Sequence, residues 1–501
     1  MKIKTILLSE IRDHYPVILI GSFEGDKNLE RQVALLGEEA VSQVKGLKQD
    51  KIFTGKSRES FPLILNQSKL AKGVILFGLG PQDKFSLKSL REMGSSFLAE
   101  IRRLKAKTAA ILLPSFSNKK FPIDIIGQTM TESLLLSEYK FDRYRLKKEE
   151  DVAKKSLESV DFLVLKSGEQ KLAERGKEIG EIIAESVKFA RDLGNEPANI
   201  MTPTRMTQEA KKISQQHGVK CEILGEKEIK KLGMGGILGV AQGSHEPANL
   251  VILEYRPKNP KKTICLVGKG ITFDTGGISL KPAKDMEKMK YDMMGAACVI
   301  ASVNAIKRLG LPFHVIGITP ICENLPSQKP QRPGDVVTAY NKKSVEVINT
   351  DAEGRLILMD ALSYSEKFKP DVIIDLATLT GAVAATFADK CIGLMGNDKK
   401  LTNRIFEAGM KSGERCWELP MWDDYLDMIK GDITDLKNVG SGYAGTITAA
   451  KFLEQFVPKN TPWAHLDIAG VAWADSPKPF TPKGPTGAGI RLLIQLLRDW
   501  K

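Results

Sequence analysis

From residue 250 onward, short apolar runs alternate with segments of helical periodicity. The runs are rich in Val, Ile and Leu and most are closed by turn-forming residues, a pattern typical of buried strands. This alternation restricts the fold to the α/β class, with helices covering a largely parallel or mixed central sheet. The predicted strands are 250–255, 263–268, 313–320, 345–349, 371–377, 391–396 and 464–470, and the predicted helices are 286–309, 355–368, 401–411 and 446–457.

The first third of the chain predicts a smaller α/β domain. Its strands are expected at 15–23, 72–80 and 108–116, with helices at 30–48 and 86–106. A long amphipathic pattern over 168–193 ends at Gly194-Asn195, which is typical of a helix C-terminus. Because 501 residues exceed what one core normally serves, we expect an N-terminal domain (1–167), a connecting helix (168–194) and a larger catalytic domain with a mixed sheet (195–501).

Composition places the chain among globular proteins of a reducing compartment. The formal net charge of +13 is spread along the sequence, so no segment is indicated as a nucleic-acid-binding tail. The six cysteines form no C-x-x-C pair, and three in apolar runs (Cys265, Cys298 and Cys322) are expected to be buried. No apolar run approaches the roughly 18 residues of a membrane span, and the N-terminal apolar run is too short for a signal peptide. We therefore expect a cytoplasmic protein without membrane partners.

The segment VEVINTDAEGRLILMDAL, residues 345–362, places Asp351, Glu353 and Arg355 at a predicted strand-to-helix turn. The ordinary explanation is helix capping, since Asn, Thr and Asp are good N-caps and acidic residues suit the first helical turn. Capping alone does not explain the acidic residues that follow other predicted strands.

The glycine-rich stretch GKGITFDTGGISLKP, residues 268–282, directly follows a predicted strand and carries Lys269, Asp274 and Lys281. Such a loop is able to cradle a phosphate, but it matches neither G-x-G-x-x-G nor the P-loop pattern. Asp292 follows, inside a strongly apolar stretch where an acidic residue needs a partner, a ligand or an exposed position.

Asp274, Asp292, Asp351 and Glu353 are thus expected to converge where strands end, the usual place for sites in open α/β sheets. Four carboxylates together repel one another unless cations neutralise them. A pair of divalent ions such as Mn²⁺, Zn²⁺ or Mg²⁺ meets this requirement. Histidine contributes little to this hypothesis, since the two in predicted strands, His314 and His465, are expected in packing roles.

Four motifs resemble signatures of the leucyl aminopeptidases, the cytosol aminopeptidase family of dinuclear metallo-exopeptidases: VGKGITFDTGG, SLKP, MKYDMMGAA and NTDAEGRL. Supporting segments are RDLGNEPANIMTP, DLATLTGA and HLDIAGVAW, so the resemblance covers about 185–500 strongly and the N-terminal part more weakly. It implies an enzyme that releases N-terminal amino acids from peptides, leucine preferred, in peptide turnover. It also implies a homohexamer.

The resemblance further implies a role for each matching residue. Two divalent ions per subunit, Mn²⁺ or Zn²⁺ with Mg²⁺ as a further candidate, would be bound by Lys269, Asp274, Asp292, Asp351 and Glu353. Asp274 and Glu353 would bridge both ions. Lys281 and Arg355 would be the catalytic residues, with a bicarbonate ion bound at Arg355. The substrate would be contacted by Met289, Thr378, Leu379 and Gly381.

Two other function classes remain open at the level of sequence. A DNA-binding role is compatible with the +13 charge and predicts a salt-sensitive duplex-DNA shift. A dinuclear phosphoesterase shares carboxylate-rich sites and predicts activity on phosphate esters instead of amino-acyl amides. A lysine ligand argues against the phosphoesterase.

Overall fold

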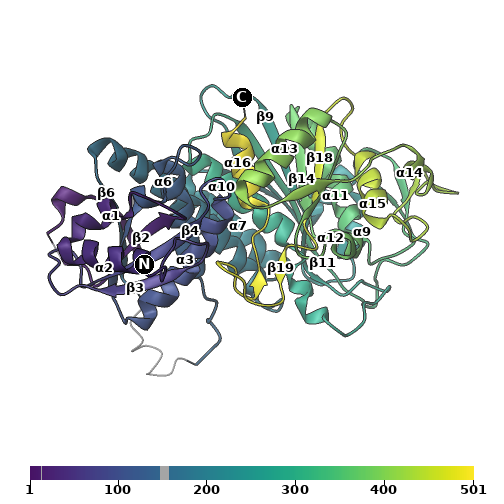
Figure 1. Cartoon of the computed structure of the whole chain (residues 1–501). Coiled ribbons are helices and arrows are strands. Elements are labelled where there is room, and N and C mark those ends of the chain that lie inside the picture. Colours follow the sequence, from purple (N-terminus) through teal and green to yellow (C-terminus); the bar gives the residue numbers. More distant parts are fainter. Residues whose placement is uncertain (13, 147–156, 501) are drawn as a thin grey trace. The chain divides into compact units, whose positions relative to one another are not determined.

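The computed structural model describes residues 1–12, 14–146 and 157–500, and its contacts divide into two compact units (Figure 1). The first comprises Met1–Ala184 with Pro477–Pro482, and the second comprises Glu185–Ser476 with Lys483–Lys501. The predicted long helix is confirmed as α6 (Ser167–Asn195), and the change of unit falls inside it. The domain boundaries at 167 and 194 therefore stay a prediction.

The first unit contains a six-stranded sheet in the order β1-β6-β5-β2-β4-β3, parallel except for β3. The predicted strands are confirmed as β2, β4 and β5, while β1, β3 and β6 were not predicted. The predicted helix 30–48 is interrupted at Gly37, whose φ of 109° ends one helical segment before the next begins. The strands are β1 (Lys2–Leu7), β2 (Ile18–Phe23), β3 (Ser60–Ile64), β4 (Gly73–Gly80), β5 (Thr108–Leu112) and β6 (Ser159–Val164), and the helices are α1 (Leu29–Val33), α2 (Glu38–Gln49), α3 (Leu87–Arg103) and α4 (Ile123–Ser137).

The second unit is built on a nine-stranded mixed sheet in the order β16-β15-β18-β14-β9-β11-β8-β7, with β10 paired to β11. The central strands β18, β14, β9 and β11 run parallel, and β8 and β15 are antiparallel to their inner neighbours. The strands are β7 (Lys220–Leu224), β8 (Asn249–Tyr255), β9 (Thr263–Gly268), β10 (Gly270–Asp274), β11 (His314–Asn324), β14 (Val372–Ala377), β15 (Ile392–Gly396), β16 (Cys416–Glu418) and β18 (Trp463–Asp467).

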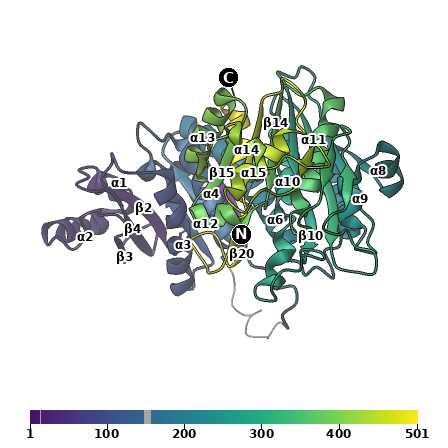
Figure 2. The ribbon, with the colours of Figure 1, turned by 90° about the vertical axis from the view of Figure 1, so that its right-hand side faces the viewer.

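Helices cover this sheet in two groups (Figures 1 and 2). On one side α10 packs against the central strands and against α7 and α16, and on the other α11 packs with α9 and α15. Both faces of the central strands are therefore buried, which explains their continuous apolar sequences. The helices are α7 (Pro203–His217), α8 (Glu226–Leu232), α9 (Gly235–Ala241), α10 (Met294–Arg308), α11 (Glu353–Tyr364), α12 (Gly381–Phe387), α13 (Lys399–Ser412), α14 (Asp424–Asp427), α15 (Gly445–Glu454) and α16 (Ile490–Arg498).

Two predicted elements near the acidic residues differ from the structure. The predicted strand 345–349 is shorter, β13 (Ser344–Glu346), and belongs to a separate three-stranded sheet with β12 (Val336–Thr338) and β17 (Leu436–Lys437). Residues 347 and 348, which were predicted to continue the strand, are hydrogen bonded to the loop residues Gly334, Asp335 and Asn438. The predicted helix 286–309 is divided into a 3₁₀ segment (Met286–Tyr291) and α10, because the chain leaves helical geometry between them. In the described part of the chain, no helix is long and apolar enough to cross a membrane.

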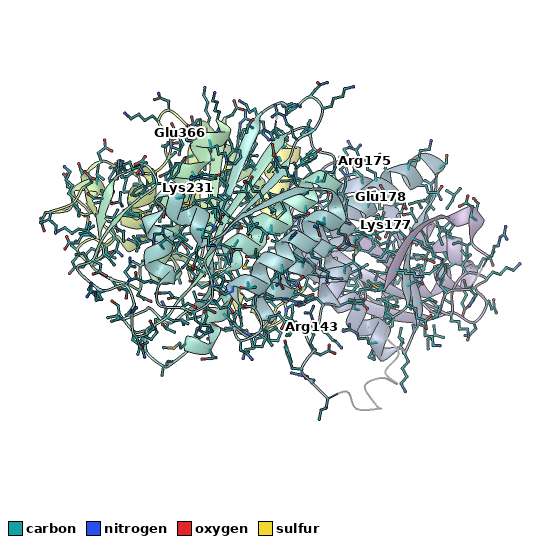
Figure 3. All side chains as sticks on the ribbon, turned by 180° about the vertical axis from the view of Figure 1, so that it is seen from behind. Arg143, Arg175, Lys177, Glu178, Lys231 and Glu366 are labelled. Carbon is teal, nitrogen blue, oxygen red and sulfur yellow. The ribbon has the colours of Figure 1, made fainter. Side chains whose placement is uncertain are left out.

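The charged surface carries both signs. Figure 3 shows Arg175, Lys177 and Glu178 on α6, with basic and acidic side chains adjacent. Lys177 forms an ion pair with Glu174 at 2.6 Å. The net positive charge is therefore interspersed with acidic groups on this helix.

Candidate metal centre

The site forms where the central sheet is interrupted at Lys269. β9 and β10 both pair with β11, β9 along its first half and β10 along its second. Between them the Lys269 N–H donates to the Leu376 carbonyl of β14 (3.1 Å), and its carbonyl accepts from the Ala296 N–H of α10 (2.7 Å). This irregularity removes Lys269 from the strand ladder and lets its side chain join the ends of other segments.

Lys269 links the segments that carry Asp292 and Glu353. Its Nζ lies 2.7 Å from Asp292 Oδ2 and 2.8 Å from Glu353 Oε1, and it donates to the Thr378 carbonyl at 2.9 Å. Gly354 makes room for this side chain, since a Cβ there would lie 2.5 Å from Lys269 Cε. The glycine within DAEGR is therefore required by the approach of the lysine.

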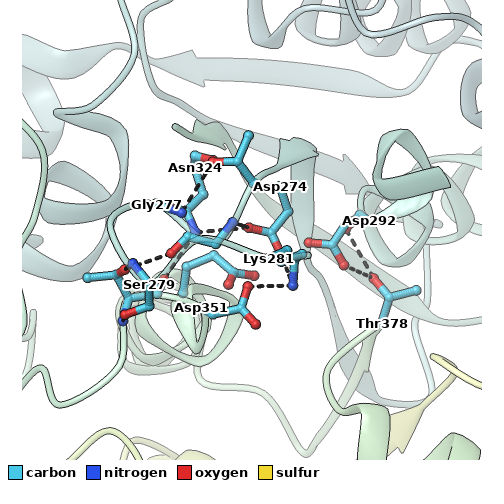
Figure 4. Close-up of polar contacts among 12 residues, drawn as sticks. Asp274, Gly277, Ser279, Lys281, Asp292, Asn324, Asp351 and Thr378 are labelled. Carbon is cyan, nitrogen blue, oxygen red and sulfur yellow. Dashed lines mark hydrogen bonds and ion pairs between the residues drawn. The ribbon is translucent and has the colours of Figure 1, made fainter. Parts of the chain in front are cut away.

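Lys281 links two further carboxylates of the cluster, those of Asp274 and Asp351 (Figure 4). Its Nζ lies 2.8 Å from Asp274 Oδ2 and also contacts Asp351 Oδ1. Two residues with positive φ, Gly276 at 86° and Gly277 at 65°, turn the chain after β10 so that Lys281 returns to Asp274. The predicted glycine-rich loop thus brings a lysine back to a carboxylate, and phosphate binding is not needed to explain it.

Asp274 is oriented from the end of β11. Its Oδ1 accepts hydrogen bonds from the Gly276 N–H and from Asn324 Nδ2, both at 2.9 Å (Figure 4). Asn324 also donates to the Thr350 carbonyl at 3.0 Å. One oxygen of Asp274 is therefore fixed by hydrogen bonds while the other faces the cluster.

The turn carrying Asp351 and Glu353 is not built as a capped helix start. The N-cap of α11 is Ala352, which has no capping side chain, and Glu353 is the first helical residue. Thr350 donates to the Gly276 carbonyl at 2.6 Å, and Asp351 N–H donates to Asn349 Oδ1 at 2.8 Å. Capping by these polar residues is therefore excluded as the explanation for the motif.

Asp274, Asp351 and Glu353 offer oxygen atoms that all lie within 4.8 Å of one another. Asp292 joins them through Lys269, and Thr378 Oγ1 donates to its Oδ1 at 2.7 Å. The second oxygen of Glu353, Oε2, is buried without a hydrogen-bond partner in the described structure. An unpaired buried oxygen on a carboxylate that belongs to such a cluster is what a cation ligand requires.

Burial raises the pKa values of Asp274, Asp292 and Asp351 above their ordinary values. Burial raises the pKa of Asp292 well above its ordinary value, and burial together with the Glu353 charge raises the pKa of Asp274. Burial disfavours the charged forms of Lys269 and Lys281, but the carboxylates outweigh it, so the pKa of each lysine rises. Four carboxylates share two ammonium groups, and divalent cations would neutralise the remainder.

Arg355 lies in the first turn of α11 and is not hydrogen bonded to the cluster. Its Nη1 donates to the Asn438 carbonyl at 2.6 Å, while its Nε is buried without a hydrogen-bond partner in the described structure. Burial lowers its pKa to about 10. A guanidinium with an unused buried donor fits a bound anion.

The predicted substrate residues surround the loop after β14. Thr378 contacts Lys269 and Asp292, Gly381 begins α12, and the Leu379 N–H donates to Asp467 Oδ1 at 3.1 Å. Met289 lies in the 3₁₀ segment, half-buried, with its carbonyl accepting from the Asp292 N–H at 3.2 Å. These positions place all four beside the metal cluster or its supporting loop.

The two strand histidines lie outside the cluster. His314 bonds Thr263 and Glu254, and His465 Nδ1 lies 2.5 Å from Asp375 Oδ1. Three residues that the sequence interpretation did not select support the site: Asn324, Asn438 and Asp467. Each is buried in the folded chain, and no pattern in the sequence marks any of them.

Comparison with known proteins identifies the family. Residues 188–494 match the model "Cytosol aminopeptidase family, catalytic domain", and residues 19–148 match "Cytosol aminopeptidase family, N-terminal domain". The chain belongs to the cytosol aminopeptidase family. A probable cytosol aminopeptidase of Solibacter usitatus is 45% identical over 86% of this aminopeptidase and 88% of the relative, and one of a Geobacter species (strain M21) is 40% identical over 96% of both.

Solved structures agree with this assignment. A tomato leucine aminopeptidase mutant matches with a TM-score of 0.86 and 32% identity, covering 100% of this aminopeptidase and 97% of that chain. The bottromycin maturation enzyme BotP in complex with Mn matches with a TM-score of 0.83 and 30% identity, covering 97% and 99%. The predicted fold class, family and metallo-aminopeptidase activity are confirmed, and the phosphoesterase alternative is set aside.

Proposed function

We propose that this aminopeptidase binds two divalent cations per subunit and releases N-terminal amino acids, leucine preferred, in peptide turnover. The observation that supports the pair of ions is the carboxylate cluster itself, which includes the unpaired Glu353 Oε2. Oxygen ligands of this kind suit Mn²⁺ or Zn²⁺, with Mg²⁺ as a further candidate. The manganese in the BotP structure favours testing Mn²⁺ first.

The proposed ligands follow from the two sets of ion pairs in the cluster, those of Lys269 with Asp292 and Glu353 and those of Lys281 with Asp274 and Asp351. Asp274 and Glu353 are proposed to bridge both ions. Asp274 pairs with Lys281 and Glu353 pairs with Lys269, and oxygens of these two carboxylates and of Asp351 lie within 4.8 Å of one another. Lys269 and Asp292 would complete one position, and Asp351 the other. Ligation by Lys269 requires the neutral amine, and adjacent cations lower the pKa of a buried lysine in that direction.

When bound, a pair of divalent cations supplies an acidic water as nucleophile and polarises the scissile carbonyl. Lys281 is proposed to donate a hydrogen bond to the oxyanion that develops on that carbonyl. Its ammonium is suited to this because neighbouring carboxylates keep it charged, and its side chain is about one-fifth exposed, at 21%, toward solvent. Lys281 thus acts on the reacting atoms without being a ligand.

Arg355 is proposed to hold a bicarbonate ion, which when bound would supply a proton-accepting group beside the cluster. The support is the unused buried Nε and the position of Arg355 two residues after Glu353. Arginine keeps its charge at neutral pH even with the pKa lowered to about 10. The guanidinium therefore binds an anion without itself serving as the base.

The loop 378–381 is proposed to align the substrate backbone beside the cluster. Thr378, Leu379 and Gly381 would contact the peptide, and Met289 would line an apolar pocket for its first side chain. An apolar pocket of this kind favours leucine through the hydrophobic effect, with each methylene contributing about 0.8 kcal/mol.

We also propose a homohexamer located in the cytoplasm. The support for the location is that relatives are named cytosol aminopeptidases and that the described cysteines, Cys221, Cys265, Cys298, Cys322, Cys391 and Cys416, are all free thiols. Analytical ultracentrifugation of the full chain tests the hexamer, and a sedimenting monomer or dimer would contradict it.

The activity is tested with leucine p-nitroanilide after Mn²⁺ preincubation. We expect chelator-sensitive release of nitroaniline, faster than from the glutamate analogue. N-acetyl-leucine p-nitroanilide is the matched control, since an exopeptidase requires the free α-amine. Equal rates on the acetylated substrate, or release that survives metal removal, would contradict the proposed function.

A further inference from the structure

Asn438 lies directly after β17, and its side chain is hydrogen bonded to the backbone of residues 348–352, the turn that carries Asp351. The side chain is fully buried. Its Oδ1 accepts from the N–H groups of Ile348 (2.8 Å) and Asn349 (3.3 Å), and its Nδ2 donates to the carbonyls of Asn349 (2.7 Å) and Ala352 (3.5 Å). One amide therefore satisfies backbone groups on both sides of Asp351.

The backbone of Asn438 is bonded to the same region. Its N–H donates to the Glu346 carbonyl at 3.0 Å, and its carbonyl accepts from Arg355 Nη1 at 2.6 Å. The latter is a charge-assisted hydrogen bond, which is stronger than a neutral one. Asn438 therefore holds the end of β13, the turn and the guanidinium at once.

Asn438 is connected to the proposed ligand Asp351 through Asn349. Asn349, held by Asn438, accepts the Asp351 N–H on its own side chain at 2.8 Å. No periodic structure spans residues 347–352, since β13 ends at Glu346 and α11 begins at Glu353. The geometry of this turn thus depends on side-chain hydrogen bonds instead of a helix or a sheet ladder.

We propose that Asn438 is a positioning residue that fixes Asp351 and Arg355 relative to each other. The proposal rests on the proposed catalytic function of Arg355. Removing the amide takes a hydrogen-bond partner from four backbone groups, of which the Asn349 carbonyl keeps the Ala352 N–H at 3.2 Å. It also frees the peptide whose carbonyl holds Arg355. Supporting residues of metal sites typically contribute about 10–100-fold to metal affinity or activity, and we expect that range for kcat here.

The test compares Asn438→Ala with Asn304→Ala in the full-length enzyme. Asn304 is also a buried asparagine of the second unit, in α10, and donates to the Ile300 carbonyl at 2.8 Å, away from the cluster. We expect both variants to lower the melting temperature, but Asn438→Ala alone to lower kcat about 10–100-fold with KM changed less than about threefold. Among the described residues, the hydrogen-bond partners of Asn438 lie in 346–355 and none in the loop 378–381, so KM is expected to remain close to that of the wild type.

A double-mutant comparison separates positioning from simple destabilisation. In an Arg355→Ala background, we expect Asn438→Ala to lower kcat by less than about threefold further, because its main effect acts through Arg355. Mn²⁺ titration calorimetry provides a readout independent of turnover, and we expect weaker binding of one ion in Asn438→Ala and unchanged binding in Asn304→Ala.

Three outcomes would overturn the inference. These are a normal kcat in Asn438→Ala, full additivity with Arg355→Ala, or unchanged Mn²⁺ binding in Asn438→Ala. If Asn438→Ala gives no folded protein, Asn438→Ser is measured in its place, since it keeps a small polar side chain without the amide that reaches both backbone segments. The activity of the wild-type enzyme is measured before any variant. If that activity were not sensitive to a chelator, the proposed function would be refuted instead of the role of Asn438.

Discussion

Replacing Lys281 with alanine should separate catalysis from metal binding. The Lys281 ammonium bridges the buried Asp274 and the partly exposed Asp351. Its removal takes away the donor proposed for the oxyanion and leaves both carboxylates free to bind cations. We therefore expect Lys281→Ala to retain two Mn²⁺ ions per subunit, bound at least as tightly as in the wild type.

The expected loss in rate follows from the position of the charge. A pair of unit charges about 4 Å apart at an effective dielectric constant of about 20 contributes about 4 kcal/mol, and loss of one oxyanion donor typically costs about 2.7–4 kcal/mol. Because the Lys281 side chain is 21% exposed, solvent screens part of this charge. We expect kcat to fall about 10²–10³-fold, with a smaller change in KM.

The assay is leucine p-nitroanilide hydrolysis at saturating Mn²⁺, with metal content measured by mass spectrometry on the same samples. Lys288→Ala is the matched control, since Lys288 is a nearby lysine that pairs with Asp285 at 3.0 Å and Asp475 at 2.8 Å. Its kcat should equal that of the wild type. Near-normal turnover in Lys281→Ala, or loss of metal in that variant, would refute the assigned role.

Three further predictions concern the cluster and the core. Asp274→Ala and Glu353→Ala should each lose both ions and nearly all activity, measured by metal content and turnover, and a variant that keeps two ions would contradict the bridging assignment. Trp463→Phe should lower the free energy of unfolding by about 1–3 kcal/mol in urea titrations, because it leaves the buried Asp375 Oδ2 without the indole donor now 2.7 Å away; an unchanged midpoint would contradict this. Burial raises the pKa of Asp360 from 3.8 to about 7. Between pH 3.8 and about 7 the Asp360 carboxyl is therefore protonated in the folded chain and ionised in the unfolded chain. The contribution of Asp360 to the free energy of unfolding is present at low pH and is lost as pH rises through 7. Asp360→Asn should flatten that part of the profile of urea midpoint against pH, and an unaltered slope would refute the assignment.

The fold class was predictable because the central strands are buried on both faces. Runs such as residues 263–268 and 371–377 are continuously apolar for that reason, and they are β9 and β14. Strands β1, β3 and β6 lacked such clear boundaries and were not predicted. β1 and β3 are the edges of their sheet, where strands receive less burial and leave a weaker pattern in the sequence, whereas β6 is an interior strand whose apolar run is interrupted by Asp161.

The convergence of the acidic residues was predictable from their positions after strands, whereas their support was not. Asp274 ends β10, but the 345–349 segment is a short strand of a separate sheet, so its approach depends on tertiary contacts. Asn438 and Asp467 support the site by accepting hydrogen bonds from the backbone of distant segments, at Ile348 and Leu379. Such contacts leave no periodic pattern in the sequence. Polar residues that bond distant backbone are therefore found only once the chain is folded.

The most direct test of the account is anomalous diffraction from crystals grown with Mn²⁺, recorded on both sides of the manganese edge. The account predicts two peaks about 3.5–4 Å apart, both in contact with Asp274 and Glu353, one also bound by Lys269 and Asp292 and the other by Asp351. A single peak, or two peaks while Lys269 remains an ammonium paired with Asp292, would contradict the dinuclear site proposed for this enzyme.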